Sequence, residues 1–249
     1  MLPPAERLLI VPLGLCAMLP YSAGVDPRGG RLVDHTAITL APSLAWARAA
    51  RRPAPEGANV GVFHPGDPPL DLAGDMETFT EHVGGLVAQP PTAEVVLELL
   101  RHDTRIGHFS CHGTYDALRP LKSALLLETP LDVRAVIGHG SAPWLVNLSA
   151  CETAMPDLRA AEQLISFPTA FLLGGAAHVL ATLWMAGDIE ATEVNRQIYR
   201  AVASGAHPGE ALRAAVNHRL RPGRDQPGTE ASAPHPLWWA PFVHHGSPW

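Results

Sequence analysis

The sequence has little charge and almost no lysine. Charged residues make up 17% of its 249 residues, the net charge is −6, and Lys122 is the only lysine. Proteins that bind a nucleic-acid backbone carry rows of Lys and Arg that neutralise phosphates, and no such row occurs in this sequence. We therefore expect no nucleic-acid partner. Hydrophobic residues reach 47%, which allows a sizeable core and argues against general disorder.

Cysteine and long apolar segments are also scarce. The three cysteines, Cys16, Cys111 and Cys151, are too few and odd in number for a disulfide framework, and they fit a reducing compartment. The mostly apolar run at residues 8–19 is too short to span a bilayer. It also lacks the basic start of a signal peptide, because acidic Glu6 lies there. These features predict a cytoplasmic protein with no membrane partner.

Several catalytic and cofactor motifs are missing. The sequence contains no Gly-x-Ser-x-Gly, and Ser149 lacks the flanking glycines that a serine nucleophile elbow needs. The run Gly174-Gly175-Ala176 has neither the lysine of a phosphate loop nor the spacing of a dinucleotide fingerprint. We expect neither a serine hydrolase nor a nucleotide site, and we expect no cofactor.

Short apolar runs alternate with helical patterns along the chain. The apolar runs predict strands at residues 7–12, 35–40, 60–63, 106–110, 118–127, 145–148 and 179–183. Helices are expected at residues 43–50, 75–83, 93–101, 131–137, 160–172, 189–203 and 208–219. Continuous apolar strands are typical of a sheet that is covered on both faces. The sequence therefore predicts an α/β fold, with a mostly parallel sheet of about six strands and helices on both faces. Without a repeat or an internal boundary, residues 1–249 are expected to form one domain.

Two of these strands end in residues that suit covalent chemistry. The stretch 106–113 reads Ile-Gly-His-Phe-Ser-Cys-His-Gly, and the stretch 144–153 reads Trp-Leu-Val-Asn-Leu-Ser-Ala-Cys-Glu-Thr. Parallel sheets bind ligands at the carboxyl ends of their strands, so His112 and Cys151 are expected to meet there. An imidazole can take the thiol proton and leave a nucleophilic thiolate. The backbone N–H groups of Gly113 and Cys151 would then polarise a scissile carbonyl. The alternative is a buried cysteine and a structural histidine at two strand ends.

A metal site is less well supported. His108 and His112 would lie about 13 Å apart on one strand, and Cys111 would face the opposite side. His244-His245, near the end of the sequence, is expected at the surface, and no metal is predicted.

Asp188 follows the predicted strand at residues 179–183 and has two possible roles. It can cap the helix that starts at residue 189, or it can present a carboxylate to a basic substrate side chain at the same edge as Cys151. The two roles are compatible.

The two motifs together resemble the CHAT domains, which are caspase-like cysteine peptidases that often follow TPR repeats. The resemblance extends over most of the chain and includes Ile-Val-Pro at 10–12, Ala-Pro-Ser at 41–43, Gly-Gly-Ala-Ala-His-Val-Leu-Ala-Thr-Leu-Trp at 174–184 with Asp188, Glu-Ala-Leu-Arg-Ala at 210–214 and His-Pro-Leu-Trp-Trp-Ala-Pro-Phe at 235–242. It implies a three-layer αβα sandwich similar to caspases and separase. It also implies that His112 is the catalytic histidine, that Cys151 is the nucleophile, and that an acidic residue near Asp188 selects Arg or Lys before the cut.

Two positions depart from the family pattern. Ala154 stands where the family often has Gly, and Met-Ala-Gly at 185–187 replaces a more usual Pro-Val-Asp-like run. The resemblance implies a cysteine endopeptidase that cleaves a protein substrate, in bacterial defence or cell-death signalling. No TPR repeat lies within these residues, so a TPR or other sensor domain would act as an activator from upstream in a longer protein, or the domain stands alone. The alternative is a catalytically silent interaction or sensor module.

Overall fold

The computed structural model describes residues 6–26, 29–49, 52–150, 153–154, 165–220 and 235–249. Cys151 lies outside these described residues. The strands are β1 (Arg7–Ile10), β2 (Ala37–Leu40), β3 (Asn59–Phe63), β4 (Leu86–Val87), β5 (Ile106–Ser110), β6 (His112–Thr114), β7 (Ala124–Leu126), β8 (Leu131–Asp132), β9 (Leu145–Ser149), β10 (His178–Thr182) and β11 (Phe242–Gly246). The helices are α1 (Leu32–His35), α2 (Leu44–Ala49), α3 (Ala73–His82), α4 (Ala93–Leu99), α5 (Val133–His139), α6 (Phe167–Leu173), α7 (Asp188–Ala203) and α8 (Pro208–Leu220).

The central sheet has eight strands within the described residues, in the order β1-β2-β11-β10-β9-β5-β3-β4. Neighbouring strands are parallel except at the antiparallel pair β10–β11. The α/β fold with a mostly parallel sheet is therefore confirmed, with more strands than the six expected. A second, antiparallel sheet joins β6, β7 and β8 beside the central one.

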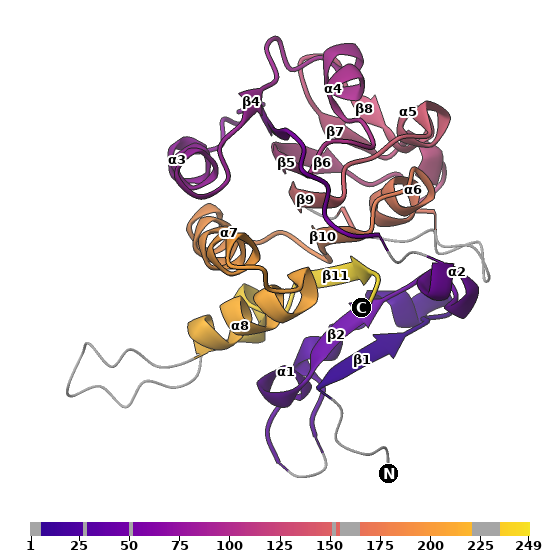
Figure 1. Cartoon of the computed structure of the whole chain (residues 1–249), viewed down its shortest axis with the longest axis vertical. Helices are drawn as coiled ribbons and strands as arrows, with labels where there is room; N and C mark the ends of the chain where they lie inside the picture. Colours follow the sequence, from indigo (N-terminus) through magenta and orange to yellow (C-terminus); the bar gives the residue numbers. More distant parts are fainter. Residues whose placement is uncertain (1–5, 27–28, 50–51, 151–152, 155–164, 221–234) are drawn as a thin grey trace, which may run out of the picture.

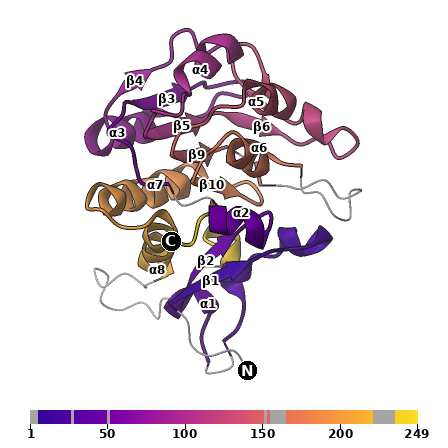
Figure 2. The ribbon, with the colours of Figure 1, turned by 45° about the vertical axis from the view of Figure 1, so that its right-hand side comes forward.

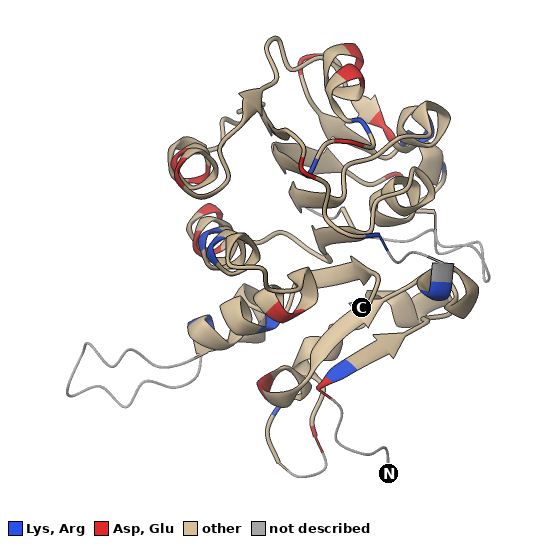
Figure 3. Cartoon of the chain, in the orientation of Figure 1, with Lys and Arg blue, Asp and Glu red and all other residues tan. Residues whose placement is uncertain are grey.

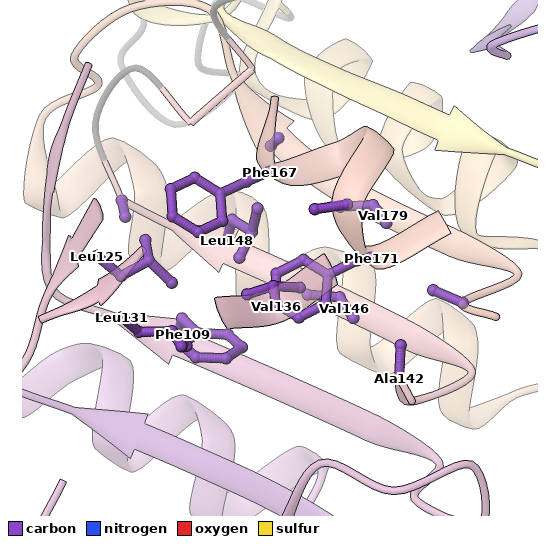
Figure 4. Close-up of a cluster of buried hydrophobic side chains, with 14 of the residues drawn as sticks. Phe109, Leu125, Leu131, Val136, Ala142, Val146, Leu148, Phe167, Phe171 and Val179 are labelled. Carbon is purple, nitrogen blue, oxygen red and sulfur yellow. The ribbon is translucent and has the colours of Figure 1, made fainter. Parts of the chain in front are cut away.

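Helices cover both faces of the central sheet. α3, α7 and α8 pack in sequence along one side, and α4, α5 and α6 lie on the other (Figures 1 and 2). Because side chains alternate between the two faces of a strand, neighbouring residues of β5 and β9 enter different layers. Phe109 and Leu148 point into the layer of α5 and α6, where Phe171 of α6 contacts the Phe109 ring at 5.8 Å between centroids (Figure 4). All three side chains are buried, and an alanine at Phe109 would cost about 3–5 kcal/mol.

Local signals in the sequence account for several helix ends. The Thr92 side chain caps α4 by accepting from the N–H of Val95 at 3.3 Å, as expected from its type and place. In α6, Pro168 lies in the first turn, where its missing N–H costs nothing. The expected helix over 160–172 is thus found from Phe167 onward, and residues 160–164 lie outside the described part. None of the described helices is both long and apolar enough to cross a membrane.

The small sheet departs from the expected local structure. His112–Thr114 forms β6, a strand that was not expected, and it pairs with β7. The apolar run at 118–127 does not join the central sheet, since its strand β7 belongs to the small one.

His244 is buried rather than exposed, which corrects the surface placement of the 244–245 pair. β11 lies between β2 and β10, so His244 is enclosed on both sides and is only 1% exposed. It shares a hydrogen bond with His178 of β10 (Nε2 to Nδ1, 3.1 Å) and one with Thr39 of β2 (3.0 Å). The His207 ring packs against both imidazoles, at 4.8 Å from His178 and 5.5 Å from His244 between centroids. The hydrogen bonds of His244 thus connect β2, β11 and β10.

Stability should fall in acid because these imidazoles are buried in neutral form. Burial, with a further contribution from His207, lowers the pKa of His178 to about 3, far below the 6.5 of an exposed histidine. The unfolded chain therefore binds protons first as the pH falls below about 6.5, and stability is lost from there down to the folded pKa. Each such histidine contributes up to about 1.4 kcal/mol per pH unit. Urea unfolding between pH 7 and 4 should show this slope, and His178→Asn, which keeps an acceptor near Nδ1, should flatten it. Equal slopes in the two proteins would contradict the assignment.

Candidate active site

The strands β5 and β9 end side by side. They pair in parallel, and their last residues, Ser110 and Ser149, are direct partners in the register. His112 follows two residues after Ser110, and Cys151 follows two residues after Ser149 in the sequence. The chain therefore leaves both strands at one edge of the sheet, as the sequence predicts for His112. The position of Cys151 itself lies outside the described residues.

The chain on either side of Cys151 is anchored to the end of β10. The Thr182 hydroxyl donates to the carbonyl oxygen of Ala150 at 2.9 Å, and the N–H of Ala154 donates to the Thr182 carbonyl at 3.0 Å. Thr153 also donates from its hydroxyl to the Ala150 carbonyl at 3.2 Å. Ala154, which departs from the family pattern, is 3% exposed, so its methyl group is accommodated within the protein.

His112 is held by the loop that follows β3. Its Nε2–H donates to the carbonyl oxygen of Pro68 at 2.7 Å. A neutral imidazole that donates through Nε2 has its lone pair on Nδ1, which makes Nδ1 the proton acceptor. Gly66, at φ +69°, lies against the ring so closely that a Cβ there would overlap Cδ2 of His112. His112 is half-buried, and the next residue, Gly113, pairs with Leu125 in the small sheet.

A pocket opens at this edge of the sheet. Its walls include Cys111 and Ala150, the residues that precede His112 and Cys151 in the sequence. Asp188 lines the same pocket from the first turn of α7. Asp188 is not the N-cap, which corrects one of its two expected roles: Gly187 occupies that position, without a side-chain cap. The exposed Asp188 side chain also lines an adjacent groove formed by α7, α8 and the start of α3.

A buried polar network lies beneath the pocket, on the face opposite Phe109 and Leu148. The Tyr199 hydroxyl donates to His108 Nδ1 at 2.6 Å, and His108 Nε2–H donates to Asp75 at 3.1 Å. Asn147 donates from Nδ2 to the Tyr199 oxygen at 2.7 Å and to Asn195 Oδ1 at 2.9 Å. These residues come from α3, β5, β9 and α7, so the network joins two helices to the middle of two neighbouring strands.

Asp75 is the charged centre of this network. Burial alone would raise the pKa of Asp75, but His108 beside it and hydrogen bonds from His108, Asn195 and Ser110 lower the pKa to about 2. Burial raises the pKa of Tyr199, so its hydroxyl keeps its proton and acts as a donor. The stabilising contribution of Asp75 is therefore complete above about pH 4 and is lost as the pH falls toward 2.

The structure does not bring the potential metal ligands together. His108 faces Asp75 and Tyr199, whereas His112 faces Pro68. Within the described part of the chain, no group of three or more His, Cys, Asp or Glu residues is placed to hold a metal ion.

The fold and the two motifs define the class of protein. The CHAT domain family matches residues 2–247, and the chain belongs to this family. Among curated proteins, none matches the sequence.

Solved structures of cysteine peptidases share the fold. The separase–securin complex of Saccharomyces cerevisiae superimposes with a TM-score of 0.62 at 14% identity, over 93% of this chain and 15% of the separase-complex chain. The Arg-specific cysteine proteinase gingipain R gives a TM-score of 0.53 at 10% identity, over 85% of this chain and 54% of the other. The complex of the pro- and mature domains of gingipain from Porphyromonas gingivalis gives 0.52 at 11% identity, over 82% and 51%. The fold is thus caspase-like, and this chain spans a small part of the separase chain and about half of the gingipain chains.

Sequence reasoning missed the residues that support the site. The carbonyl of Pro68 carries no side-chain signal, and Asp75 and Asn195 lie on helices that are 120 residues apart in the sequence. One signal was present: His108 and Asn147 are polar residues within apolar strands, each four residues before a candidate catalytic residue. They are partners in the β5–β9 register, so their common spacing indicates a shared buried contact.

The contact of Gly66 with His112 gives a test of how the imidazole is held. Gly66→Ala should displace the His112 ring, because the new methyl group overlaps it. Gly140→Ala is the matched control: Gly140 has nearly the same φ, +66°, and nothing within 4 Å of its Cβ position. Both variants should lose about 1–2 kcal/mol from the left-handed backbone. Only Gly66→Ala should shift the His112 imidazole resonances in ¹H–¹³C NMR spectra, and unshifted resonances in that variant would contradict the described contact.

Proposed function

We propose that this protein is a cysteine endopeptidase in which Cys151 is the nucleophile and His112 is its proton acceptor. The observation that carries the proposal is the register of β5 and β9, in which Ser110 faces Ser149 two residues before each proposed catalytic residue. Membership of the CHAT family and the likeness to cysteine peptidases support the same chemistry.

The proposed mechanism uses the tautomer that Pro68 favours. With Nε2–H donated to the Pro68 carbonyl, His112 accepts the Cys151 thiol proton at Nδ1. The thiolate attacks the peptide carbonyl, and the backbone N–H groups of Gly113 and Cys151 stabilise the oxyanion. His112 then returns its proton to the leaving amine, which breaks the C–N bond and leaves a thioester. Water, activated by the same imidazole, hydrolyses the thioester and restores the thiol.

Asp188 is proposed to select Arg or Lys on the amino side of the cut. Its exposed carboxylate lines the pocket that Ala150 also borders, and Asp71 lines that pocket from the segment before α3. Acidic residues are frequent on α3 and in the first turn of α7 (Figure 3). A carboxylate binds a guanidinium or ammonium group through charge-assisted hydrogen bonds. Gingipain R, named as Arg-specific, has the same fold.

The proposed substrate is a protein, and the proposed setting is regulated proteolysis in bacterial defence or cell-death signalling in the cytoplasm. An upstream TPR or other sensor domain would act as the activator. A silent interaction module is the second candidate, and the small size of the pocket favours it. The space within the pocket is about 50 Å³, well below the ~300–1,000 Å³ of ordinary ligand pockets. In a peptidase, an activator or the substrate itself would have to widen this space.

Replacing either member of the dyad should abolish cleavage without unfolding the chain. Cys151→Ala and His112→Ala remove the nucleophile and the base, so new amino termini should disappear from a proteome-derived peptide library read by mass spectrometry. Unfolding in urea should remain cooperative in both variants. A peptide acyloxymethyl ketone should label Cys151, and the exposed Cys16 provides the internal control. Cleavage that persists in Cys151→Ala, or a probe that prefers Cys16 or Cys111, would refute the assignment.

The preference for basic residues should depend on the Asp188 charge. Asp188→Asn should raise KM for peptides with Arg or Lys before the cut by about 10-fold or more, because the ion pair is lost. Glu190→Gln is the control on the same helix, since Glu190 pairs with Arg219 at 3.2 Å and does not line the pocket of Ala150. An unchanged ratio of basic to neutral peptides in Asp188→Asn would show that another group sets the preference.

A further inference from the structure

The ends of β5 and β9 are joined to one buried carboxylate, Asp75. We propose that Asp75 and Asn195, acting through the hydroxyl groups of Ser110 and Ser149, are positioning residues that hold His112 and Cys151 in reactive alignment. This inference rests on the proposed function, because it concerns how the same dyad is aligned.

Asp75 reaches the strand that leads to His112. The hydroxyl of Ser110, the last residue of β5, lies near the Asp75 carboxylate and helps to lower its pKa. Ser110 and Asp75 line the same pocket, and Ser110 is only 5% exposed, so bulk water weakens this contact little. His112 lies two residues after Ser110, about 7 Å further along an extended chain.

Asn195 links Asp75 to β9, the strand that precedes Cys151 in the sequence. Its Nδ2 group donates one N–H to Asp75 at 2.9 Å and the other to the Ser149 oxygen at 3.2 Å. Its Oδ1 accepts from Asn147 at 2.9 Å, so the amide orientation is determined on both sides. One amide thus links the carboxylate to the last residue of β9.

The two serines occupy equivalent positions at the end of the β5–β9 pair. Ser110 and Ser149 face each other in the register, and each precedes a proposed catalytic residue by two positions. Asp75 cannot move away from them, because His108 and Asn195 also donate to its oxygens. A shift of either strand end would be passed along two residues to the reacting atoms. A misplacement of the reacting atoms by about 1 Å can cost about 100-fold in rate. The contacts of Asp75 and Asn195 would therefore control the reactivity of Cys151.

If the network only attached the helices to the sheet, the two serine hydroxyls would not be needed. The helices α3 and α7 are already joined to the sheet by the Asp75–His108 and Tyr199–His108 bonds. The serines add the only described links from Asp75 and Asn195 to the terminal residues of the two strands. Removing the two serine hydroxyls therefore tests the alignment of the strand ends while α3 and α7 stay attached to the sheet.

The test measures the reactivity of Cys151 directly, so that it needs no substrate. Site-resolved mass spectrometry would follow the alkylation of Cys151 by iodoacetamide in the full chain between pH 5 and 9. In the parent protein, alkylation at neutral pH should exceed that of His112→Ala, because the imidazole promotes the thiolate. Ser149→Ala and Ser110→Ala should each lower the rate toward that of His112→Ala, by about 10-fold in the double variant. Ser149→Thr, which keeps a hydroxyl, should restore most of the parent rate and its pH profile.

Ser123→Ala is the matched control. Ser123 is 7% exposed and accepts from the N–H of Asp116 at 3.1 Å, outside the network. It should lose comparable stability and keep the parent alkylation profile. Serine variants that fold cooperatively and keep the parent profile would overturn the positioning role while leaving the dyad intact. A parent whose profile already equals that of His112→Ala would instead remove the dyad, and the positioning role with it.

Discussion

The parallel pairing of β5 with β9 is the constraint on which the site depends. It places Ser110 beside Ser149, Phe109 beside Leu148 and His108 beside Asn147. A slip of β9 by one residue would turn all of its side chains to the opposite face of the sheet. Leu148 would then meet α3 and α7, and Asn147 would enter the layer of α5 and α6. The two-sided burial therefore fixes the register, and the register fixes where the two motifs leave the sheet.

The two faces of the sheet divide the tasks of stability and polarity. On the side of α5 and α6, Phe109, Leu148 and Phe171 form a close-packed apolar core. On the side of α3 and α7, the same two strands carry a histidine and an asparagine whose hydrogen bonds converge on Asp75. A buried carboxylate is tolerated only because these donors replace water. The apolar face stabilises the fold by burial, and the hydrogen bonds of the polar face restrict the strands to one arrangement.

The sequence allowed the fold class and the core strands to be predicted because buried parallel strands leave continuous apolar runs. The sequence could not reveal the hydrogen-bond network around Asp75, because α3 and α7 approach each other only in the folded chain. It also gave no sign that β11 enters the sheet between β2 and β10, because the pair His244–His245 looks polar and its burial depends on partners far away in the chain. For the site, His112 was placed correctly at the strand edge, whereas the role of Asp188 as a cap failed because Gly187 takes that position. The placement of Cys151 stays a prediction.

The buried groups at the two ends of the parallel strands respond differently to acid. His178 is the first residue of β10, at the edge opposite the strand ends that carry the site, and burial lowers its pKa to about 3. Protonation of the unfolded chain below about pH 6.5 therefore lowers the free energy of unfolding of the whole domain. Asp75 keeps its charge down to about pH 2, so its hydrogen bonds with His108 and with Asn195, which in turn contacts Ser149 of β9, persist over this range. Loss of stability in mild acid would then arise from the buried histidines and not from failure of the Asp75 network.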